Sequence, residues 1–259
     1  MKHSRLMGII GLSVSIAMFA TGCIGTQQAP AEVNVDAGDV ADETVIINPS
    51  AEEKVDYKVT RTGFDFFQNS LDRYEYYGYV EVENTGNCDL YLSECTYDLE
   101  DSGGRLLQTG EFYYSCPSVI SPGEKGYFYN GKASNILDEN VSVENGLQMK
   151  TNPKLTKADG KPEILPVDDV SIRDDDYGCV GVLGRVRNNT EKDIPYADVT
   201  IILHGYNGEI IGFLDASASN IAAGSKESFQ TSTVFTDSRI ELKDIADYKI
   251  IAEAMYDSY

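Results

Sequence analysis

Apolar and polar residues alternate along many short stretches of this chain, which is the pattern of β-strands that bury one face. In Arg73–Val82 the residues on one side of a strand would be Tyr74, Tyr76, Gly78, Val80 and Val82. In Val199–Leu203 the apolar residues Val199, Ile201 and Leu203 are again two positions apart. Turn residues separate such stretches at Asp101–Gly104 and Tyr206–Glu209, where glycine supplies the positive φ that tight hairpins need. No segment keeps a sustained helical period, so the sequence predicts an all-β fold.

The plan of strand, polar loop, strand, tight turn and strand occurs twice. Val80–Leu107 and Gly184–Ile211 align without a gap at an offset of 104 residues. The matched pairs include Val82 with Val186, Asn84 with Asn188, Asp89 with Asp193, Thr96 with Thr200, Leu99 with Leu203 and Gly104 with Gly208. Later matches, such as Phe128 with Phe229, occur at an offset of 101, so the second copy is three residues shorter in between. A fixed offset indicates duplication of one folding unit.

About 200 residues follow the N-terminal region, enough for two domains of about 100 residues. Many short strands with regular turn signals are typical of β-sandwiches, in which two sheets bury their alternate residues against each other. We therefore expect a first sandwich at 54–152, a Pro- and Gly-containing linker at 153–166 and a second sandwich at 167–259. One short helix is expected within Asp237–Asp247.

The N-terminus has the features of an export signal. A short basic region precedes an apolar stretch, Leu6–Ala20, and the sequence Ala20-Thr21-Gly22-Cys23 resembles a lipobox, with Ala20 where leucine is usual. This predicts a lipoprotein signal peptide at 1–22 and lipidation of Cys23, which would hold the protein on membrane lipid at the outer face of the cytoplasmic membrane. The alternatives are an ordinary secretion signal and a transmembrane anchor. Residues 23–53 are polar and lack periodicity, so a disordered tether is expected.

The chain is strongly acidic, with 42 Asp and Glu residues against 21 Lys and Arg and a formal net charge of −21. Such a charge repels nucleic acid, so no nucleic-acid partner is expected.

Four cysteines remain beyond Cys23, and export would permit disulfides. If the chain turns back at Asp101–Gly104, facing residues have numbers that sum to about 205, which brings Cys88 opposite Cys116. We predict a Cys88–Cys116 disulfide; Cys95–Cys116 and two free thiols are the alternatives. Cys95 lies in the inward row of its strand and is expected to be a small core residue.

Catalytic and metal-binding patterns are absent from the sequence. The only histidine beyond the signal is His204, and no CxxC, HExxH or phosphate-binding loop occurs. We therefore expect no enzyme, no cofactor and no metal site. The acidic residues between Asp168 and Asp176 leave a calcium site open as an alternative to a solvated loop. Two glycosylation sequons begin at Asn140 and Asn188 and matter only in a host that glycosylates.

Tyrosine is unusually abundant, with 17 residues and no tryptophan. Parity places Tyr77 and Tyr79 on the face opposite Tyr76, so an exposed pair is expected. Exposed tyrosine suits contacts with a protein or a glycan, which makes Tyr77 and Tyr79 the candidate binding residues. The alternative is that these rings fill strand faces.

The order V-N-N-T, V-T-I-x-L, G-x-I-I and G-x-x-x-x-F resembles the FxLYD family of small immunoglobulin-like domains in surface lipoproteins. The resemblance covers about Val180–Phe235 and, less completely, Tyr76–Tyr129; the family's Leu-Tyr-Asp is Leu99-Glu100-Asp101 and Leu203-His204-Gly205 here. It implies two tandem immunoglobulin-like modules that bind or space without catalysis. We expect a non-catalytic, lipid-anchored surface protein with two binding modules, and the alternative is a structural spacer of the cell envelope.

Overall fold

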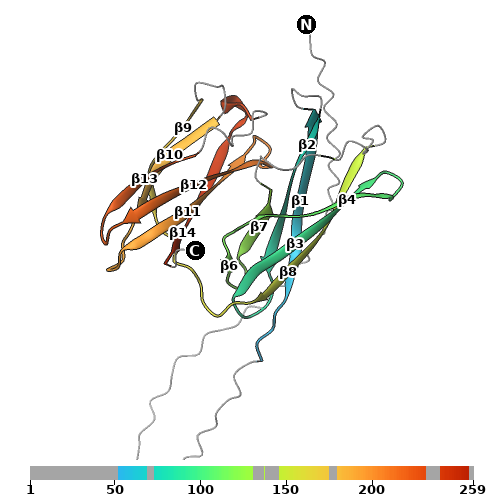
Figure 1. Cartoon of the computed structure of the whole chain (residues 1–259). Helices are drawn as coiled ribbons and strands as arrows, with labels where there is room; N and C mark the ends of the chain where they lie inside the picture. Colours follow the sequence, from blue (N-terminus) through green and yellow to red (C-terminus); the bar gives the residue numbers. More distant parts are fainter. Residues whose placement is uncertain are drawn as a thin grey trace, which may run out of the picture. The chain divides into compact units, whose positions relative to one another are not determined.

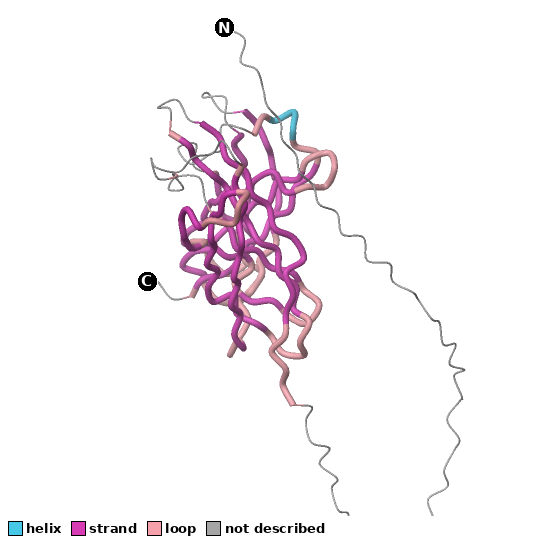
Figure 2. Tube along the Cα trace, turned by 90° about the vertical axis from the view of Figure 1, so that its right-hand side faces the viewer, coloured by secondary structure: helices cyan, strands magenta, loops and turns pink. Residues whose placement is uncertain are grey.

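The structure is a computed structural model, and it describes residues 52–68, 73–130, 137, 146–174, 180–231 and 240–256. These residues form an all-β fold of antiparallel sheets, which confirms the predicted fold class (Figures 1 and 2). The strands are β1 (Tyr57–Gln68), β2 (Tyr74–Asn84), β3 (Leu90–Asp101), β4 (Leu106–Glu111), β5 (Tyr114–Cys116), β6 (Val119–Ile120), β7 (Lys125–Tyr129), β8 (Leu147–Lys157), β9 (Val167–Asp174), β10 (Val180–Arg187), β11 (Ile194–His204), β12 (Ile210–Ile221), β13 (Lys226–Gln230) and β14 (Asp247–Met255).

Strands β1 to β8, here called the first half, form two sheets. One has the order β1-β2-β7-β5, and the other has the order β4-β3-β6 with β8 also paired to β3. Between them lies a buried cluster to which both sheets contribute, including Val80, Val82, Leu92, Leu99 and Phe128. Burying each such side chain contributes about 1.5–3 kcal/mol, which neither sheet would gain alone.

Strands β9 to β14, the second half, also form two sheets, with the orders β13-β10-β9 and β12-β11-β14. They enclose a second buried cluster that contains Val182, Val186, Val199, Ile201 and Leu203. The predicted inward row of β11 is therefore confirmed.

The strand pairing repeats as the sequence offset predicts. β2 pairs with β1 and β7, and β10 pairs with β9 and β13; likewise β3 pairs with β8 and β4, and β11 pairs with β14 and β12. The register repeats as well, because Val80 faces Phe128 and its copy Gly184 faces Phe229. Residues Pro49–Tyr259 form one compact unit, and the number of domains in it stays a prediction.

A buried asparagine has the same role in both halves. Asn84 is 1% exposed and donates through Nδ2 to the carbonyls of Cys88, at 2.8 Å, and Ile120, at 3.0 Å. Asn188 is 0% exposed and donates in the same way to Lys192, at 2.8 Å, and Ile221, at 2.9 Å. In the first half the side chain thus joins the loop before β3 to the end of β6, and in the second half it joins the loop before β11 to the end of β12.

The halves differ where the second copy is three residues shorter. In the second half β12 stays paired with β11 along its length. In the first half the equivalent chain leaves β3 after Glu111, pairs with β7 as β5, and returns to β3 as β6. The first half therefore has a fourth strand in the sheet that contains β2 and β7.

Two boundary expectations change. β8 continues to Lys157 and includes Pro153, so the strand extends into the segment expected to be linker. Pro153 lacks an N–H donor, which is compatible with an edge strand that pairs only with β3. Within the described part of Asp237–Asp247, the expected helix is a single 3-10 turn, η2 (Leu242–Asp244). Among the described residues, none belongs to a helix long and apolar enough to cross a membrane.

Candidate functional site

The most distinctive site is a junction between the two halves, formed by faces that an isolated sandwich would turn toward water. From the first half, the period of two that directs Val80 and Val82 into the core directs their neighbours outward. These outward residues are Tyr79 on β2, Tyr127 and Tyr129 on β7, and Cys116 on β5, and all are buried. Tyr77 packs against the same cluster.

The second half supplies an apolar face from β11, β12 and β14. Ile202, Ile210, Phe213 and Ile251 are each 7% exposed or less and complete the cluster. Phe213 is central: its ring stacks on Tyr129 with centroids 4.3 Å apart and planes at 9°. Its centroid also lies 5.7 Å from that of Tyr79 and 5.7 Å from that of Tyr127. Aromatic pairs at these separations add about 0.5–1.5 kcal/mol each beyond the area they bury.

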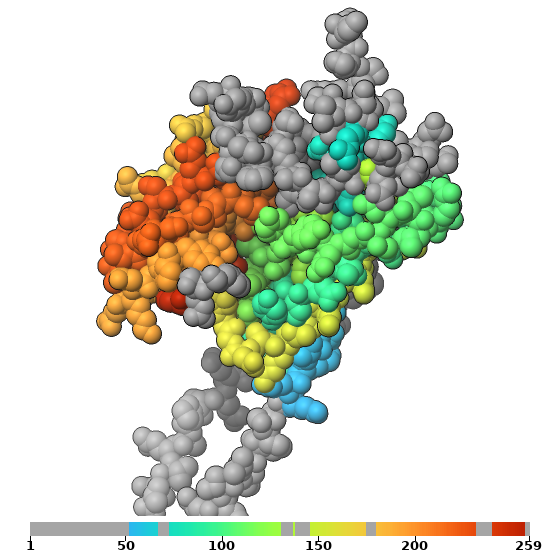
Figure 3. Space-filling model, in the orientation of Figure 1, coloured from blue at the N-terminus to red at the C-terminus, as the bar shows by residue number. Residues whose placement is uncertain are grey.

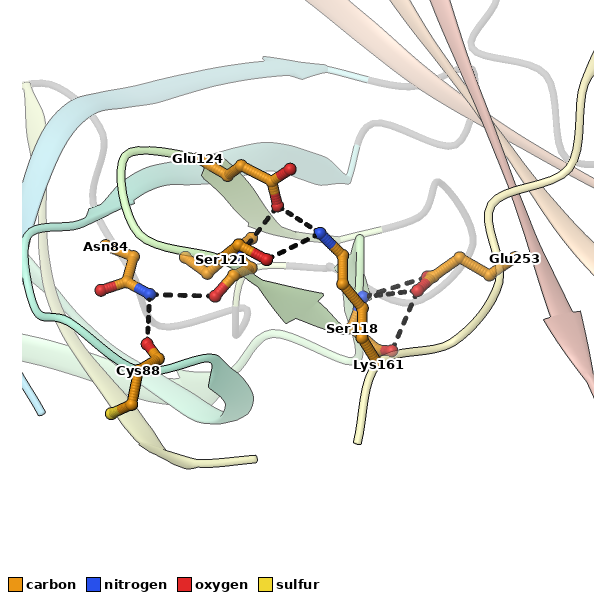
Figure 4. A network of polar contacts seen from close by, with 8 residues as sticks. Asn84, Cys88, Ser118, Ser121, Glu124, Lys161 and Glu253 are labelled. Carbon is orange, nitrogen blue, oxygen red and sulfur yellow. Dashed lines mark hydrogen bonds and ion pairs between the residues drawn. The ribbon is translucent and has the colours of Figure 1, made fainter. Parts of the chain in front are cut away.

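Hydrogen bonds cross the same junction. The Tyr129 hydroxyl donates to Asp215 at 2.5 Å, and Asp215 remains exposed at the rim. The Glu253 carboxylate, which is 7% exposed, accepts from the Ser118 backbone N–H and hydroxyl at 3.0 Å (Figure 4). Arg61 donates to the Gly208 carbonyl at 3.1 Å. Directional bonds of this kind fix how the apolar faces register.

The connecting segment is also held. Lys161 donates to Ser121 at 3.0 Å and to Glu124 at 2.6 Å, both in the first half (Figure 4). Leu165 donates its N–H to Ala252 at 2.8 Å, so the same segment extends the edge of β14. The segment expected to be a linker is therefore bonded to both halves.

Burial shapes the electrostatics of the junction. It raises the pKa of the Cys116 thiol to about 12, so this thiol is protonated at neutral pH. Burial, with the Asp215 carboxylate nearby, raises the pKa of Tyr129 well above its usual range. Burial also raises the pKa of Glu253, while the two donors of Ser118 oppose that change. These groups make hydrogen-bonded contacts between the halves, and neither the Cys116 thiol nor the Tyr129 hydroxyl is activated as a nucleophile.

The structure places the predicted binding residues Tyr77 and Tyr79 in this junction. Their outward direction is as predicted, but Tyr79 is only 4% exposed because Phe213 covers it. The expected exposed pair is therefore absent: parity identified the face, and a strand more than 130 residues later occupies it.

The predicted Cys88–Cys116 disulfide is wrong, because both thiols are free. The prediction assumed one continuous hairpin with facing numbers that sum to about 205. The register instead starts with Leu99 facing Gln108 and ends with Leu90 facing Ile120, and Cys116 lies in β5, which pairs with β7 of the other sheet. Cys95 is also free and is 0% exposed, which confirms it as a core residue.

Other predicted residues have simpler outcomes. Cys23, Cys179, Asp175, Asp176 and Asn140 lie outside the described residues. Asp168 forms ion pairs with Arg187 and with Lys226, the latter at 2.9 Å. Among the described residues, no group of three or more His, Cys, Asp or Glu side chains is placed to hold a metal ion. His204 is half-buried at the end of β11.

The asparagine of the sequon at Asn188 is buried and hydrogen-bonded within the fold. Both hydrogens of its side-chain amide are donated to backbone carbonyls, and the residue is 0% exposed. A glycan on Asn188 would require the same nitrogen and would break the loop that it holds.

Sequence reasoning missed the second face of the junction. Its signal was present in the run Thr200–Leu203, in which Ile202 interrupts the alternation between Ile201 and Leu203. A strand that is apolar at consecutive positions buries both of its faces. No protein-family model matches this chain, and a search of curated proteins finds no significant match.

Proposed function

We infer that this chain is a non-catalytic, lipid-anchored surface protein in which two immunoglobulin-like modules of the FxLYD type act as one stiff body. The lipobox-like sequence that ends in Cys23 supports attachment to membrane lipid at the outer face of the cytoplasmic membrane. The net charge of −21 supports an extracytoplasmic surface role without nucleic acid.

The junction carries the proposal of stiffness. Tandem domains joined by a flexible linker move independently by default, because their mutual contacts are small and polar. Here Phe213 contacts four tyrosine rings, Glu253 is bonded to Ser118, and Lys161 attaches the connecting segment. A stiff body keeps a fixed separation between its own two ends, while the tether sets how far it can reach from the lipid.

The same observation bears on the choice between a binding protein and a spacer. Tyr77 and Tyr79 contribute to the junction, so a binding function for a surface protein or glycan requires another face. A spacer needs no exposed ligand-binding surface, so the burial of Tyr77 and Tyr79 favours the spacer alternative.

Membrane fractionation of a bacterial host that expresses the chain tests the anchoring. The full chain should sediment with membranes and acquire a labelled fatty acid, and Cys23→Ser should lose both properties. Cys88→Ser is the matched control, because it removes a half-buried thiol without touching the lipobox. Membrane attachment of Cys23→Ser equal to that of the parent would exclude a lipid anchor at this residue.

A further inference from the structure

The duplication leaves each half with one further outer face that is equivalent to a face of the junction. The junction joins the outer face of the β1-β2-β7-β5 sheet to the outer face of the β12-β11-β14 sheet. Their copies are the outer face of β13-β10-β9 in the second half and the outer face of β4-β3-β8 in the first half. Neither copy is used in the junction, and the two differ in charge.

The outer face of β13-β10-β9 is basic. Residues directly opposite in an antiparallel pair share a face, so the registers of β10 with β9 and β13 define its membership. Four cations and two carboxylates lie on it, for a local charge of +2 in a chain of net charge −21: Arg173, Arg185, Arg187, Lys226, Asp168 and, in the bulge of β9 beside Arg185, Asp169. We call this set, with Leu183, Ser228 and Gln230, the basic face.

The centre of the basic face is hollowed. A shallow depression of about 510 Å³ is bordered by Asp169, Leu183, Arg185, Ser228 and Gln230. Its floor includes Gly184, where a Cβ atom would lie 2.7 Å from the Phe229 ring, so only glycine fits without displacing that ring. Arg185 at the rim is 55% exposed, and its contact with Asp169 is long, at 3.7 Å.

The outer face of β4-β3-β8 is acidic. The same argument from register places on it four carboxylates and two cations, for a local charge of −2: Glu94, Asp98, Glu100, Glu111, Lys150 and Lys154. Lys150 pairs with Glu100 at 2.6 Å, and the side chains of Asp98 and Glu111 are exposed on the same face. Leu106, 54% exposed, belongs to this acidic face; the surface of β3 and β4 (green) is visible in Figure 3.

Position by position, these faces are polar versions of the junction. Leu183 stands where the first half has Tyr79, and Leu106 stands where the second half has the buried Ile210. The tyrosines of β7 correspond to Ser228 and Gln230 on the basic face. Leu183 and Leu106 thus keep an apolar side chain at their positions, and Tyr91, 46% exposed, is a further apolar residue on the acidic face. Uncharged residues stand where the junction has its aromatic rings, and charges of opposite sign flank them on the two faces.

We propose that the basic face docks on the acidic face of a second copy of this chain, repeating between molecules the contact that joins the two halves within one. Charge complementarity and the equivalence to the junction both identify a second copy as the occupant. The two faces are different and lie on different halves, so the contact is head-to-tail and extends to further copies unless a ring closes. Anchored molecules would form rows on the membrane surface.

The contact depends on charge, so it is sensitive to salt. The Debye length falls from ~10 Å at 0.1 M to ~3 Å at 1 M ionic strength. Sedimentation velocity of the purified full chain in detergent should therefore show concentration-dependent association at 50 mM salt and its loss at 1 M.

Charge reversal identifies the faces. Arg185→Glu on the basic face and Asp98→Lys on the acidic face should each weaken self-association by roughly tenfold or more, because like charges then meet. A mixture of the two variants should associate again, since the carboxylate introduced on one chain then meets the ammonium group introduced on the other. Glu191→Lys, in the exposed loop after β10, is the control and should leave association unchanged, and melting curves of all variants check that each is folded.

Two outcomes overturn the proposal. One is a wild-type chain that stays monomeric at every concentration at 50 mM salt. The other is association that Arg185→Glu and Asp98→Lys leave unchanged, which would place the contact elsewhere. Neither outcome affects the lipid anchor, which the Cys23→Ser experiment tests separately.

Discussion

Asn84 and Asn188 make equivalent hydrogen bonds at equivalent depth in the two halves, whereas most of the outward-facing aromatic residues of one half have no aromatic counterpart in the other. Tyr127 and Tyr129 on β7 correspond to Ser228 and Gln230 on β13. The interior of a sandwich is close-packed and tolerates little change in shape, so both copies keep its key residues. The outer faces carry no such constraint, and one pair of them has become a contact between the copies.

The three extra residues of the first half contribute to this difference. They allow the chain after Glu111 to cross to the other sheet, so β5 brings Cys116 and Tyr114 to the junction side. Tyr114 stacks on Tyr129 with centroids 5.4 Å apart and so supports the ring that faces Phe213. In the second half the uninterrupted β12 instead presents Phe213 itself. A small change in length thus gave the two copies complementary outer faces.

The largest effect is expected where the halves are alike. Asn188→Ala would remove the hydrogen bond to the buried Ile221 carbonyl and the acceptor of the Thr190 N–H, at roughly 1–3 kcal/mol each, while the Lys192 carbonyl would keep its bond from the Thr190 hydroxyl. We expect the free energy of unfolding to fall by about 3 kcal/mol or more, measured by urea denaturation. Asn84→Ala should cost a similar amount in the first half.

The neighbouring Asn189→Ala is the control, because Asn189 is exposed and should change stability by less than about 0.5 kcal/mol. Equal and small effects of Asn188→Ala and Asn189→Ala would contradict the equivalence of the two interiors.

A loss of stability of similar size is expected from Phe213→Ala, but it acts on the coupling between the halves and not on the interior of one half. Removing a buried phenylalanine costs about 3–5 kcal/mol, and here most of the lost contacts are with the other half. Thermal unfolding should change from one transition to two, and NMR relaxation should show the halves tumbling separately. Thr109→Ala changes the equivalent exposed position of the first half and should alter neither. A single transition in Phe213→Ala would mean that the coupling of the halves does not depend on this ring.

Much of the fold was predictable because its signals are local or repeated. Alternation identified the inward rows of β2 and β11, and the Gly104 and Gly208 turns have φ of 80° and 73°, as their hairpins require. The shared offset predicted the repeated pairing. The switch of β5 between sheets was not predictable, since three extra residues do not reveal which sheet the chain joins.

The candidate site was half predictable. Parity directed Tyr77 and Tyr79 outward, but whether an outward ring meets water depends on a partner distant in sequence. The same limitation caused the disulfide error: the numbering assigned Cys88 and Cys116 to one hairpin, whereas Cys88 packs on the first-half core and Cys116 on the junction.

A modest, pH-dependent effect is expected at Glu253. Burial raises its pKa in the folded protein, so the folded state retains the proton longer than the unfolded state does. The contribution of this group to stability is therefore fully present below the unfolded pKa of about 4.3 and is lost as pH rises through the raised value. Glu253→Gln cannot titrate, so the stability of this variant relative to wild type should increase from pH 4 to pH 8 in urea denaturation.

Charged neighbours of Glu253 also affect its pKa and therefore the size of this pH dependence. Asp198 faces it across the pair of β11 and β14 and adds repulsion when both are ionised, while Lys161 acts in the opposite direction. Glu191→Gln, on an exposed loop, provides the baseline. A difference between Glu253→Gln and wild type that stays constant with pH would show that Glu253 is solvated and that the halves separate there.

The smallest perturbation is thiol labelling, which distinguishes the two cysteines without changing stability. Cys88 is half-buried at the first-half edge, whereas Cys116 is 1% exposed in the junction with its pKa raised to about 12. A maleimide reacts with the accessible thiolate, so Cys88 should label at least roughly tenfold faster than Cys116 at pH 7, as quantified by peptide mass mapping. Phe213→Ala should speed the labelling of Cys116 and leave Cys88 unchanged, because only Cys116 is covered by the second half. If neither cysteine were labelled until a reductant was added, Cys88 and Cys116 would be joined by a disulfide. The strand pairing of the first half would then be wrong, because β5 would have to lie beside β3.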